Sequence, residues 1–469
     1  MAEQIRQAPR GLATLALVGP SLIWCAEYIG SGEVILSTRT GALFGTAALW
    51  AVVAAVVLKC SIGMMGARWT AVTGEGMVDL FDRIPGPRHW LVWVVLLLQL
   101  PAAVVSIGAL GRVAGAFLNA LVPLPHGPLV WGLAASLFAV GVAWTGRFDL
   151  LKGVMSALVM VIVVGTMYVA LRTIPPLAEV VEGFVGLVPL EVPPWVPAES
   201  RIASPWHEVL PLMGWAAGGF ASQVWYTYWC LGAGYGLAAE GAWGKPADTQ
   251  RLAAIDPGEA RRIRGWCRVV HLDAGFAACI GVVVTTGFML AGAGVLRPRH
   301  LLPEGNQVAL TLSRIFSENW GPVGAVLFLL AGAAAMVSTL IGQLAGWPRL
   351  LADCARIVCP PFARLRWKSQ FRGFLMFFIV TNAAAMFVFD PVKLVQLGGQ
   401  LDGILLTPVQ ALAILVAFVF ILPRLVPRES CRLLRLGPVA IVMLATAALV
   451  FGILCVLILP ESLGKLLAS

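Results

Sequence analysis

Apolar stretches of about 20 residues recur along the whole 469-residue chain, and this recurrence most restricts the folds open to it. A helix of that length crosses the roughly 30 Å hydrocarbon core of a bilayer. The composition agrees, because 59% of the residues are hydrophobic and only 12% are charged, whereas about a quarter of the residues in soluble domains are charged. The sequence therefore predicts an all-α integral membrane protein.

We expect eleven spans, at residues 14–37, 43–66, 90–120, 127–145, 150–173, 207–236, 267–294, 319–345, 371–389, 394–423 and 437–460. No small-residue cleavage site follows the first span, so it is not expected to be a signal peptide. The division is a tail at 1–13, one transmembrane domain at 14–460 and a second tail at 461–469.

The distribution of Lys and Arg predicts the orientation. Most of the 33 basic residues fall in the N-terminal tail and in the even-numbered connections between spans. Basic residues stay on the cytoplasmic side, so we expect a plasma (inner) membrane protein with a cytoplasmic N-terminus and an external C-terminus. This topology accounts for the net charge of +9 and gives no reason to expect a nucleic-acid partner.

The first span carries Glu27 and Glu33 and is interrupted by Gly30-Ser31-Gly32. A carboxylate or a broken helix within a bilayer is tolerated where it lines a protein cavity or a polar pathway. The sixth span has a similar interruption at 216–219, followed by Ser222 and Gln223. Paired interruptions indicate a secondary transporter built from inverted repeats. The repeats would be residues 14–173 and 207–423, with 437–460 as an added eleventh helix.

Several polar residues are candidates for cargo contact. Glu33 follows the first break and could face a cation, or it could pair with Arg39 or cap the next half-helix. Asp402, close to Gln400 in the tenth span, is flanked by glycines and is the second candidate acid. Glu27 is expected to be paired internally, and Asp273 to lie at a solvated helix end.

Aromatic residues offer an alternative kind of site, since aromatic faces attract organic cations. A candidate cage comprises Tyr28, Phe220, Trp225 and Tyr226, although membrane helices also use such rings for packing. The nine cysteines form no zinc or disulfide pattern, so no cofactor is predicted. The sequence contains no HExxH, GxSxG or GxxxxGK[ST] motif, which argues against an enzyme.

Short motifs along most of the chain resemble the Nramp-type divalent-metal transporters. They are Gly19-Pro20, Tyr28-Ile29, Gly41-Ala42, Phe44-Gly45, Leu49-Trp50, Ala67-Arg68, Val72-Thr73-Gly74, Ser338-Thr339, Gly342, Leu344-Ala345-Gly346, Gln400 and Pro408. The resemblance implies a LeuT-type fold of eleven helices, in which helices one and six are broken.

The chain departs from that family at its metal site. The family's DPGN sequence corresponds to Gly30-Ser31-Gly32-Glu33, and its MPH methionine to Ser222 or Gln223. The soft sulfur that favours transition metals is therefore missing. The family's acids in the third span and histidines in the sixth have no counterparts, so the usual proton coupling is not expected.

These observations predict a transporter of a cation, with hard divalent metals as the leading cargo and oxygen ligands. Glu33 and Asp402 are the candidate metal ligands. The remaining candidate contacts are Ala26, Gly30, Ala216, Gly219, Ser222, Gln223 and Gln400. A small organic solute or amine as cargo, or a sensor without transport, are the alternatives. The oligomeric state is left open, and a monomer is compatible with the sequence.

Overall fold

The computed structural model describes residues 5–461 and residue 464, except residues 10, 145–152, 154–159, 161–162, 166, 169, 187, 197–201, 203, 242, 304–307 and 389–390. All regular elements in this described part are helices. Eight of them are long and apolar enough to cross a membrane. Three predicted spans are not among the eight, since the first and sixth are broken and the fifth, 150–173, falls largely outside the described residues.

Long helices form most of the bundle. They are α3 (Leu49–Thr73), α5 (Trp90–Leu121), α6 (Gly127–Trp144), α12 (Pro257–Ala291), α13 (Val308–Val358), α15 (Trp367–Val388) and α20 (Pro438–Ile453). Helix α13 changes direction at Gly321, whose φ of 62° and ψ of −151° are not helical. The outer helices expose large apolar side chains, such as Phe138 of α6, Val380 of α15 and Val439 of α20. Such a surface suits contact with lipid.

The predicted breaks in spans one and six are confirmed. Span one is divided into α1 (Pro20–Tyr28), a π-helical segment η2 (Gly32–Ser37) and α2 (Thr38–Phe44). Span six is divided into α9 (Trp206–Trp215) and α10 (Phe220–Ala233). Between these two helices, Ala217 and Gly218 have φ of 59° and 76°. Two successive left-handed residues end a right-handed helix.

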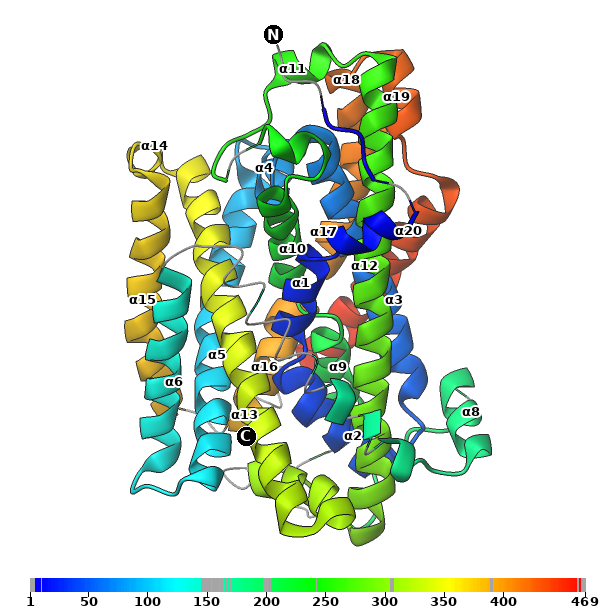
Figure 1. Cartoon of the computed structure of the whole chain (residues 1–469), viewed down its shortest axis with the longest axis vertical. Helices are drawn as coiled ribbons and strands as arrows, with labels where there is room; N and C mark the ends of the chain where they lie inside the picture. The colour runs from blue at the N-terminus through cyan, green and yellow to red at the C-terminus, as the bar shows by residue number, and fades with distance from the viewer. Residues whose placement is uncertain are drawn as a thin grey trace.

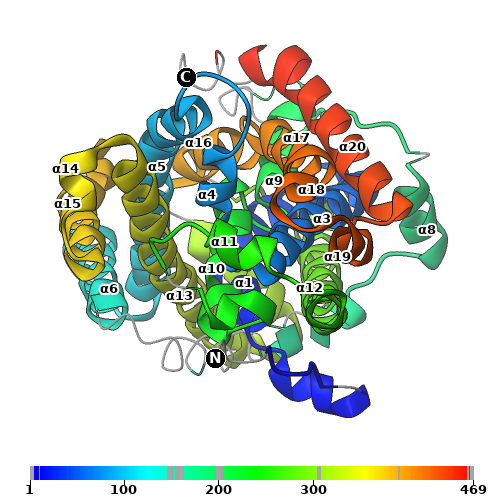
Figure 2. The same ribbon diagram turned by 90° about the horizontal axis from the view of Figure 1, so that it is seen from above.

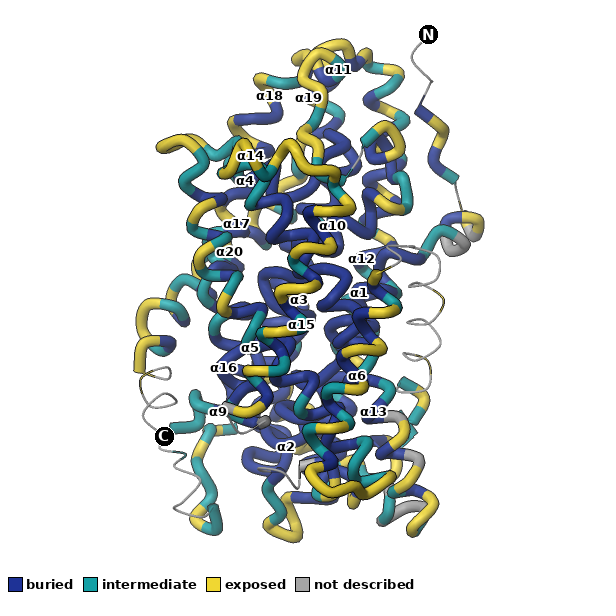
Figure 3. The backbone as a smooth tube through the Cα atoms, turned by 90° about the vertical axis from the view of Figure 1, so that its left-hand side faces the viewer, coloured by how far each residue is buried: buried dark blue, intermediate teal, exposed yellow. Residues whose placement is uncertain are grey.

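Span ten is interrupted as well. Helix α16 (Pro391–Gly403) ends one residue after Asp402, and the chain continues through α17 (Thr407–Val416), a π-helical segment and α18 (Leu422–Leu425). Helices α1, α9, α10 and α16 lie near the middle of the bundle, with α5, α6 and α15 on one side and α3, α12 and α20 on the other (Figures 1 and 2). Figure 3 shows buried residues concentrated along this middle region.

The connections separate into the two ends of the bundle. Four short helices lie with α18 at the upper end in Figure 1, namely α4 (Met77–Asp82), α11 (Thr249–Ala253), α14 (Pro360–Ala363) and α19 (Arg428–Leu434). All belong to even-numbered connections. Helix α8 (Leu177–Val185), in an odd-numbered connection, lies towards the lower end. The structure thus separates the connections as the charge pattern predicts, and the membrane orientation itself stays a prediction.

Candidate substrate-binding site

The two breaks face each other in the interior. Gly32 of η2 lies so close to α9 that a Cβ at this position would overlap the Cβ of Trp215. A Cβ on Gly218, in the second break, would lie 3.2 Å from the Cβ of Tyr28. Backbone from both halves of the chain therefore meets around one central region. Side chains that point into this region are the candidates for cargo contact.

Glu33 lies at the first break and is completely buried. Its Oε2 accepts a hydrogen bond from the Gly30 backbone N–H at 3.3 Å. Its Oε1 makes no hydrogen bond of normal geometry with any residue that the structure describes. The backbone N–H of Ala217, in the second break, is near enough to interact with the carboxylate. Glu33 thus connects the two breaks and retains an oxygen for a ligand.

Arg39, the alternative partner considered for Glu33, pairs with Glu208 of α9. Its Nε donates to Glu208 Oε2 at 2.8 Å and its second nitrogen donates to Oε1 at 3.0 Å. The Gln396 side chain of α16 also donates to Glu208 Oε1, at 3.2 Å. This buried pair holds α2 and α9 together.

Ser222 and Gln223, the two candidates for the family's methionine position, lie in different environments. The Ser222 hydroxyl donates to Glu27 Oε2 and accepts from Trp24 Nε1 at 3.0 Å. Glu27 therefore has the internal partner that we expect for it. The Gln223 amide donates to the Ala217 carbonyl at 2.8 Å, while its Oε1 is buried without a hydrogen-bond partner in the described part of the chain. Gln223 offers the freer oxygen of the two.

Asp402 binds the N-terminal end of α10. Its Oδ1 accepts the Ala221 backbone N–H at 3.0 Å, and Oδ2 lies where a Cβ on Gly219 would be. A carboxylate at a helix N-terminus is favoured by the free N–H groups there. Gln400 is buried on the same helix. The structure thus brings Asp402, near the end of α16, to the second break.

Lys59 of α3 is a central residue that the sequence reasoning missed. It is fully buried, and its Nζ donates to the carbonyls of Gly214 and Met213, the latter at 3.4 Å. It interacts electrostatically with Asp402, Glu33 and Glu27. A single lysine within the apolar run VVLKCSIG was a usable signal, because an ionisable residue inside a span is by default a candidate functional residue.

The first break is also contacted by α13. The Ser338 hydroxyl donates to the Ala26 carbonyl at 3.3 Å, and the Thr339 hydroxyl lies 3.4 Å from the carbonyls of Ala26 and Ile29. A Cβ on Gly30 would collide with the Thr339 side chain. The Ala26 carbonyl is therefore already an acceptor for protein hydroxyls.

In the second break, the Ala216 N–H still donates to the Leu212 carbonyl at 2.8 Å.

The four candidate cage residues have separate partners. Tyr28 donates to the Ala277 carbonyl at 2.6 Å. Tyr226 stacks on Trp24 with ring centroids 4.3 Å apart. Phe220 stacks on Phe81, and Trp225 meets Trp347 edge to face. All four rings are buried, and each contributes to packing between elements. An aromatic cage around a cargo stays a prediction.

Asp273 is not at a solvated helix end, so that expectation is wrong. Its side chain is buried, and it accepts hydrogen bonds from Ser21 and Tyr226. That expectation followed from its position near the start of the span expected at 267–294. However, α12 is continuous from Pro257, which places Asp273 well inside the helix.

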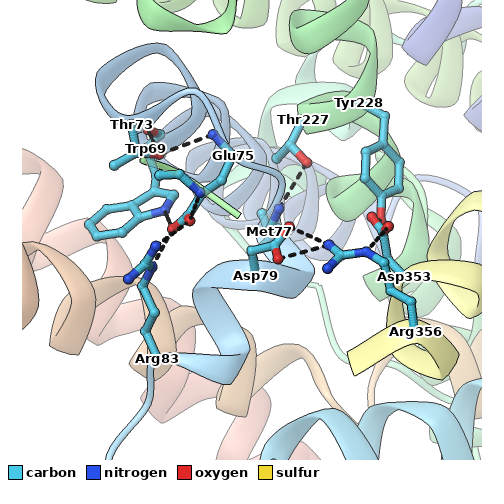
Figure 4. Close-up of polar contacts among 11 residues, drawn as sticks. Trp69, Thr73, Glu75, Met77, Asp79, Arg83, Thr227, Tyr228, Asp353 and Arg356 are labelled. Atoms are coloured by element: carbon cyan, nitrogen blue, oxygen red, sulfur yellow. Dashed lines mark hydrogen bonds and ion pairs between the residues drawn. The ribbon is translucent and has the colours of Figure 1, made fainter. Parts of the chain in front are cut away.

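A second polar cluster lies beside α4. Arg356 contacts both Asp79 oxygens, at 2.8 and 2.7 Å, and also Asp353 at 2.9 Å (Figure 4). Tyr228 of α10 donates to the other Asp353 oxygen at 2.7 Å. Nearby, Glu75 pairs with Arg83 at 2.7 Å. These contacts connect α4, α10 and α13 above the central region.

The described residues contain no group of three or more His, Cys, Asp or Glu side chains arranged to hold a metal ion. Any metal bound centrally would therefore need other oxygens in addition to carboxylates. Such oxygens are present, in the Gln223 amide and the carbonyl groups of the two breaks. Oxygen ligands of this kind suit hard cations.

Comparisons with known proteins agree with this architecture. Residues 21–193 match the family model described as natural resistance-associated macrophage protein-like. A segment is 35% identical over 81 residues to the divalent metal cation transporter MntH of Yersinia pestis, covering 17% of this chain and 20% of that protein. The matched segments span less than half of the curated relatives' own length.

Solved structures extend the likeness to the whole fold. The Eremococcus coleocola manganese transporter aligns with a TM-score of 0.65 at 13% identity, covering 100% of this chain and 97% of that one. The nucleobase-cation-symport-1 family transporter Mhp1 aligns with a TM-score of 0.54 at 14% identity, covering 99% and 94%. With its two broken helices, this chain is an integral membrane protein with a LeuT-type fold, and its residues 21–193 are similar to the Nramp-type family.

Proposed function

We propose that the chain is a secondary transporter that carries a hard divalent cation by alternating access between its two repeats, 14–173 and 207–423. The observation that carries this proposal is Glu33. Its buried Oε1 has no hydrogen-bond partner among the described residues, and it lies between two helix breaks. Burying a carboxylate oxygen without a partner is costly, so a ligand that pairs with it restores a favourable state.

The proposed ligands are oxygens from both halves of the chain. Glu33 Oε1 and Gln223 Oε1 would contact the cation directly, with Asp402 and break carbonyls such as those of Gly30, Ala216 and Gly219 completing the shell. Magnesium, calcium and manganese prefer such ligands to sulfur. The names of the matched relatives, which describe divalent-metal and manganese transporters, support a metal cargo.

We propose further that transport does not use the family's proton route. The region of α5 from Leu98 to Gly108 carries Gln99 and Ser106 as its polar side chains and no acid. Ser106 donates to Gln343 of α13 at 2.9 Å. Amides and hydroxyls do not titrate near neutral pH. Proteoliposomes with an internal pH dye should therefore show cargo uptake without acidification.

Small organic amines are the second candidate cargo. The observation that favours them is the lack, among the described residues, of a three-residue metal-binding group. Uptake and binding measurements separate the two classes of cargo. If the protein takes up an amine and binds no divalent metal, the amine proposal replaces the metal proposal. A protein that binds cargo and gives no flux would be a sensor.

The decisive experiment is uptake of Mn²⁺, Mg²⁺ and Ca²⁺ into proteoliposomes by wild type and by Glu33→Gln. The glutamine keeps the shape and removes the charge, so cation binding should weaken by about 1.5 to 3 kcal/mol. Glu179→Gln, at an exposed site on α8, is the matched control and should behave as wild type. A Glu33→Gln variant with wild-type affinity would refute the proposed site.

The membrane orientation can be tested with the exposed Cys359. This residue lies between α13 and α14, on the side proposed to be cytoplasmic. In intact cells, a membrane-impermeant maleimide should leave Cys359 unlabelled, and permeabilisation should expose it.

A further inference from the structure

Four aromatic rings surround the guanidinium of Arg349 in α13, and we call them the Arg349 cage. The guanidinium carbon Cζ lies 4.7 Å from the ring centroid of Trp243, 4.8 Å from that of Phe371, 5.5 Å from that of Trp229 and 5.6 Å from that of Trp367. All four distances are within the range of cation–π attraction. Trp229 belongs to α10, Trp367 and Phe371 belong to α15, and Trp243 lies in the connection after α10. One cation therefore joins three other parts of the chain.

The guanidinium has little compensation besides these rings. Its Nη1 donates to the Ala345 carbonyl one turn earlier in α13, and its Nε is buried with no hydrogen-bond partner among the described residues. The nearest acid along the helix, Asp353, pairs with Arg356 instead. Arg349 is only 3% exposed. Burying a cation without a counter-charge is costly, so the closed cage has a small advantage over an arrangement in which water reaches the guanidinium.

Trp243 is the ring of the cage that can leave most easily. Trp229 and Phe371 are buried and belong to helices, whereas Trp243 is partly exposed and lies outside any helix. Its indole N–H donates to the Tyr228 carbonyl at 3.3 Å. The next residue, Gly244, has a φ of 73°, a backbone conformation that favours glycine. Trp243 can thus move out of the cage without unwinding a helix.

The cage stands at one end of the contact between α10 and α13. One turn of α10 closer to the second break, Trp225 packs edge to face on Trp347 of α13. A Cβ on Gly346 would lie 2.3 Å from the Trp225 ring, so the two helices are in close contact there. Helix α10 begins at the second break, and from there this contact runs towards the upper end of the bundle in Figure 1. Separation of α10 from α13 would open a path from that end to the breaks.

We propose that Trp243 is the lid of a cation–π latch on Arg349, and that release of this lid opens the central region towards the side proposed to be cytoplasmic. The proposal rests on the proposed function, because alternating access requires such an opening. In the closed state the four rings hold α10, α15 and the connection together around one cation. When Trp243 leaves, water solvates the guanidinium and offsets the lost ring contacts.

The test follows opening at Cys354, a fully buried residue of α13. Its neighbour Asp353 accepts the hydroxyl of Tyr228, so this part of α13 faces α10. The cysteines that are not buried are replaced first, namely Cys279, Cys359 and Cys455. Maleimide labelling of Cys354 in the purified protein, followed by mass spectrometry, then reports how often the contact between α10 and α13 opens.

The variants change the lid and the cation separately. Trp243→Ala removes the lid, and Trp243→Phe keeps an aromatic face. Arg349→Met replaces the cation with an apolar side chain that packs well against aromatic rings. Trp90→Ala is the matched control, because Trp90 is also partly exposed and its indole also donates to a backbone carbonyl at 3.3 Å, that of Pro85, but its ring is not part of the Arg349 cage.

We expect Cys354 to be labelled at least about tenfold faster in Trp243→Ala than in wild type, which is the effect of losing about one desolvated cation–π contact. Arg349→Met should be labelled more slowly than wild type and melt at a higher temperature, because replacing a buried ion with an apolar side chain is often stabilising. Trp243→Phe and Trp90→Ala should resemble wild type. If Arg349 only stabilised the fold, Arg349→Met would melt at a lower temperature and be labelled faster.

Unchanged labelling in Trp243→Ala would overturn the inference, as would labelling of Arg349→Met at the wild-type rate or above it. If Trp243→Ala does not fold, Gly244→Ala replaces it. A Cβ on Gly244 would lie 2.5 Å from Cδ1 of Trp367 and would displace the connection, so this variant should also be labelled faster than wild type.

The labelling needs no cargo, so the latch and the proposed function can fail separately. Mn²⁺ uptake by wild type without the expected labelling changes would support the proposed function and refute the latch. The expected labelling changes without uptake of any divalent cation would support the latch and refute the proposed cargo.

Discussion

Asp273 of α12 caps α1 by accepting the Ser21 backbone N–H at 3.0 Å and the Ser21 hydroxyl at 2.7 Å, across 252 positions of sequence. It also accepts the Gly19 N–H at 3.2 Å and the Tyr226 hydroxyl at 2.8 Å. The first N–H groups of a helix have no acceptor within the helix, so this one carboxylate satisfies the free end of α1. Movement of α1 away from α12 requires breaking these contacts.

Asp273→Ala should release α1 and expose Cys25, which is fully buried in the same helix. Loss of a cap costs about 1 to 2 kcal/mol. We would replace the three cysteines that are not buried, Cys279, Cys359 and Cys455, and follow maleimide labelling of Cys25 by mass spectrometry. Ser21→Ala removes only the hydroxyl contact and should have a smaller effect. Equal, slow labelling in all proteins would show that the cap does not hold α1.

The Arg39–Glu208 pair should contribute more to stability than an exposed pair. Both side chains are under 5% exposed, and breaking a buried pair costs about 3 to 5 kcal/mol. Glu208→Ala should therefore lower the melting temperature substantially. The control is Glu240→Ala, whose partner Arg251 is 17% exposed and whose own side chain is 35% exposed; such pairs contribute about 0 to 1 kcal/mol. Similar losses in both variants would argue against this assignment.

Uninterrupted apolar spans could be located closely from the sequence. The spans expected at 90–120 and 127–145 are helices α5, Trp90–Leu121, and α6, Gly127–Trp144. Apolar side chains occupy most positions of both helices, so hydropathy locates their ends closely. The second span was expected at 43–66, but α3 runs from Leu49 to Thr73.

The extra turns of α3 depend on tertiary contacts. Arg68, in the polar part of this helix, donates to the carbonyls of Leu434 and Arg435 at 2.9 and 2.6 Å. Those acceptors are far away in the sequence, so the segment looked like a connection. The seventh span was expected from residue 267, whereas α12 begins at Pro257; there Asp256 caps the helix locally by accepting from the Gly258 and Glu259 N–H groups at 2.6 and 2.8 Å.

The position of the candidate site could be predicted from the sequence. The partners of its polar and charged side chains could not. Small residues at both breaks and the carboxylate of Glu33 mark the region in the sequence. The pairing of Ser222 with Glu27 and of Lys59 with the end of α9 depends on how helices cross. No local pattern in a single sequence contains that information.

Stability should depend on pH through Asp79, which lies outside the spans. Burial raises the pKa of Asp79 from 3.8 to about 7; Arg356 opposes the shift, and the nearby carboxylates of Asp353 and Glu75 add to it. Between these two values the folded protein binds more protons at Asp79 than the unfolded chain does. The contribution of Asp79 to stability is therefore fully present below about pH 4 and is lost as the pH rises to about 7. Melting temperatures measured across this range should fall less steeply for Asp79→Asn. A variant with the wild-type slope would assign the titration to another group.

The close approach of the two breaks can be tested at Gly32. An added Cβ would overlap the Cβ of Trp215, which cannot rotate away because it is attached directly to the backbone of α9. Trp215 is also held by a hydrogen bond to the Val395 carbonyl at 2.7 Å. Overpacking of this kind costs about 1 to 3 kcal/mol, which exceeds the roughly 0.5 to 1 kcal/mol that alanine gains over glycine in a helix.

Gly32→Ala should therefore separate η2 from α9, lower the melting temperature and abolish cargo uptake by proteoliposomes. Gly275→Ala is the matched control, because a Cβ at that helical position meets no atom within 4 Å. It should keep uptake and be as stable as wild type or slightly more so. Wild-type uptake by Gly32→Ala would mean that contact between the breaks is not needed for transport, and the central site would then have to be sought away from Glu33.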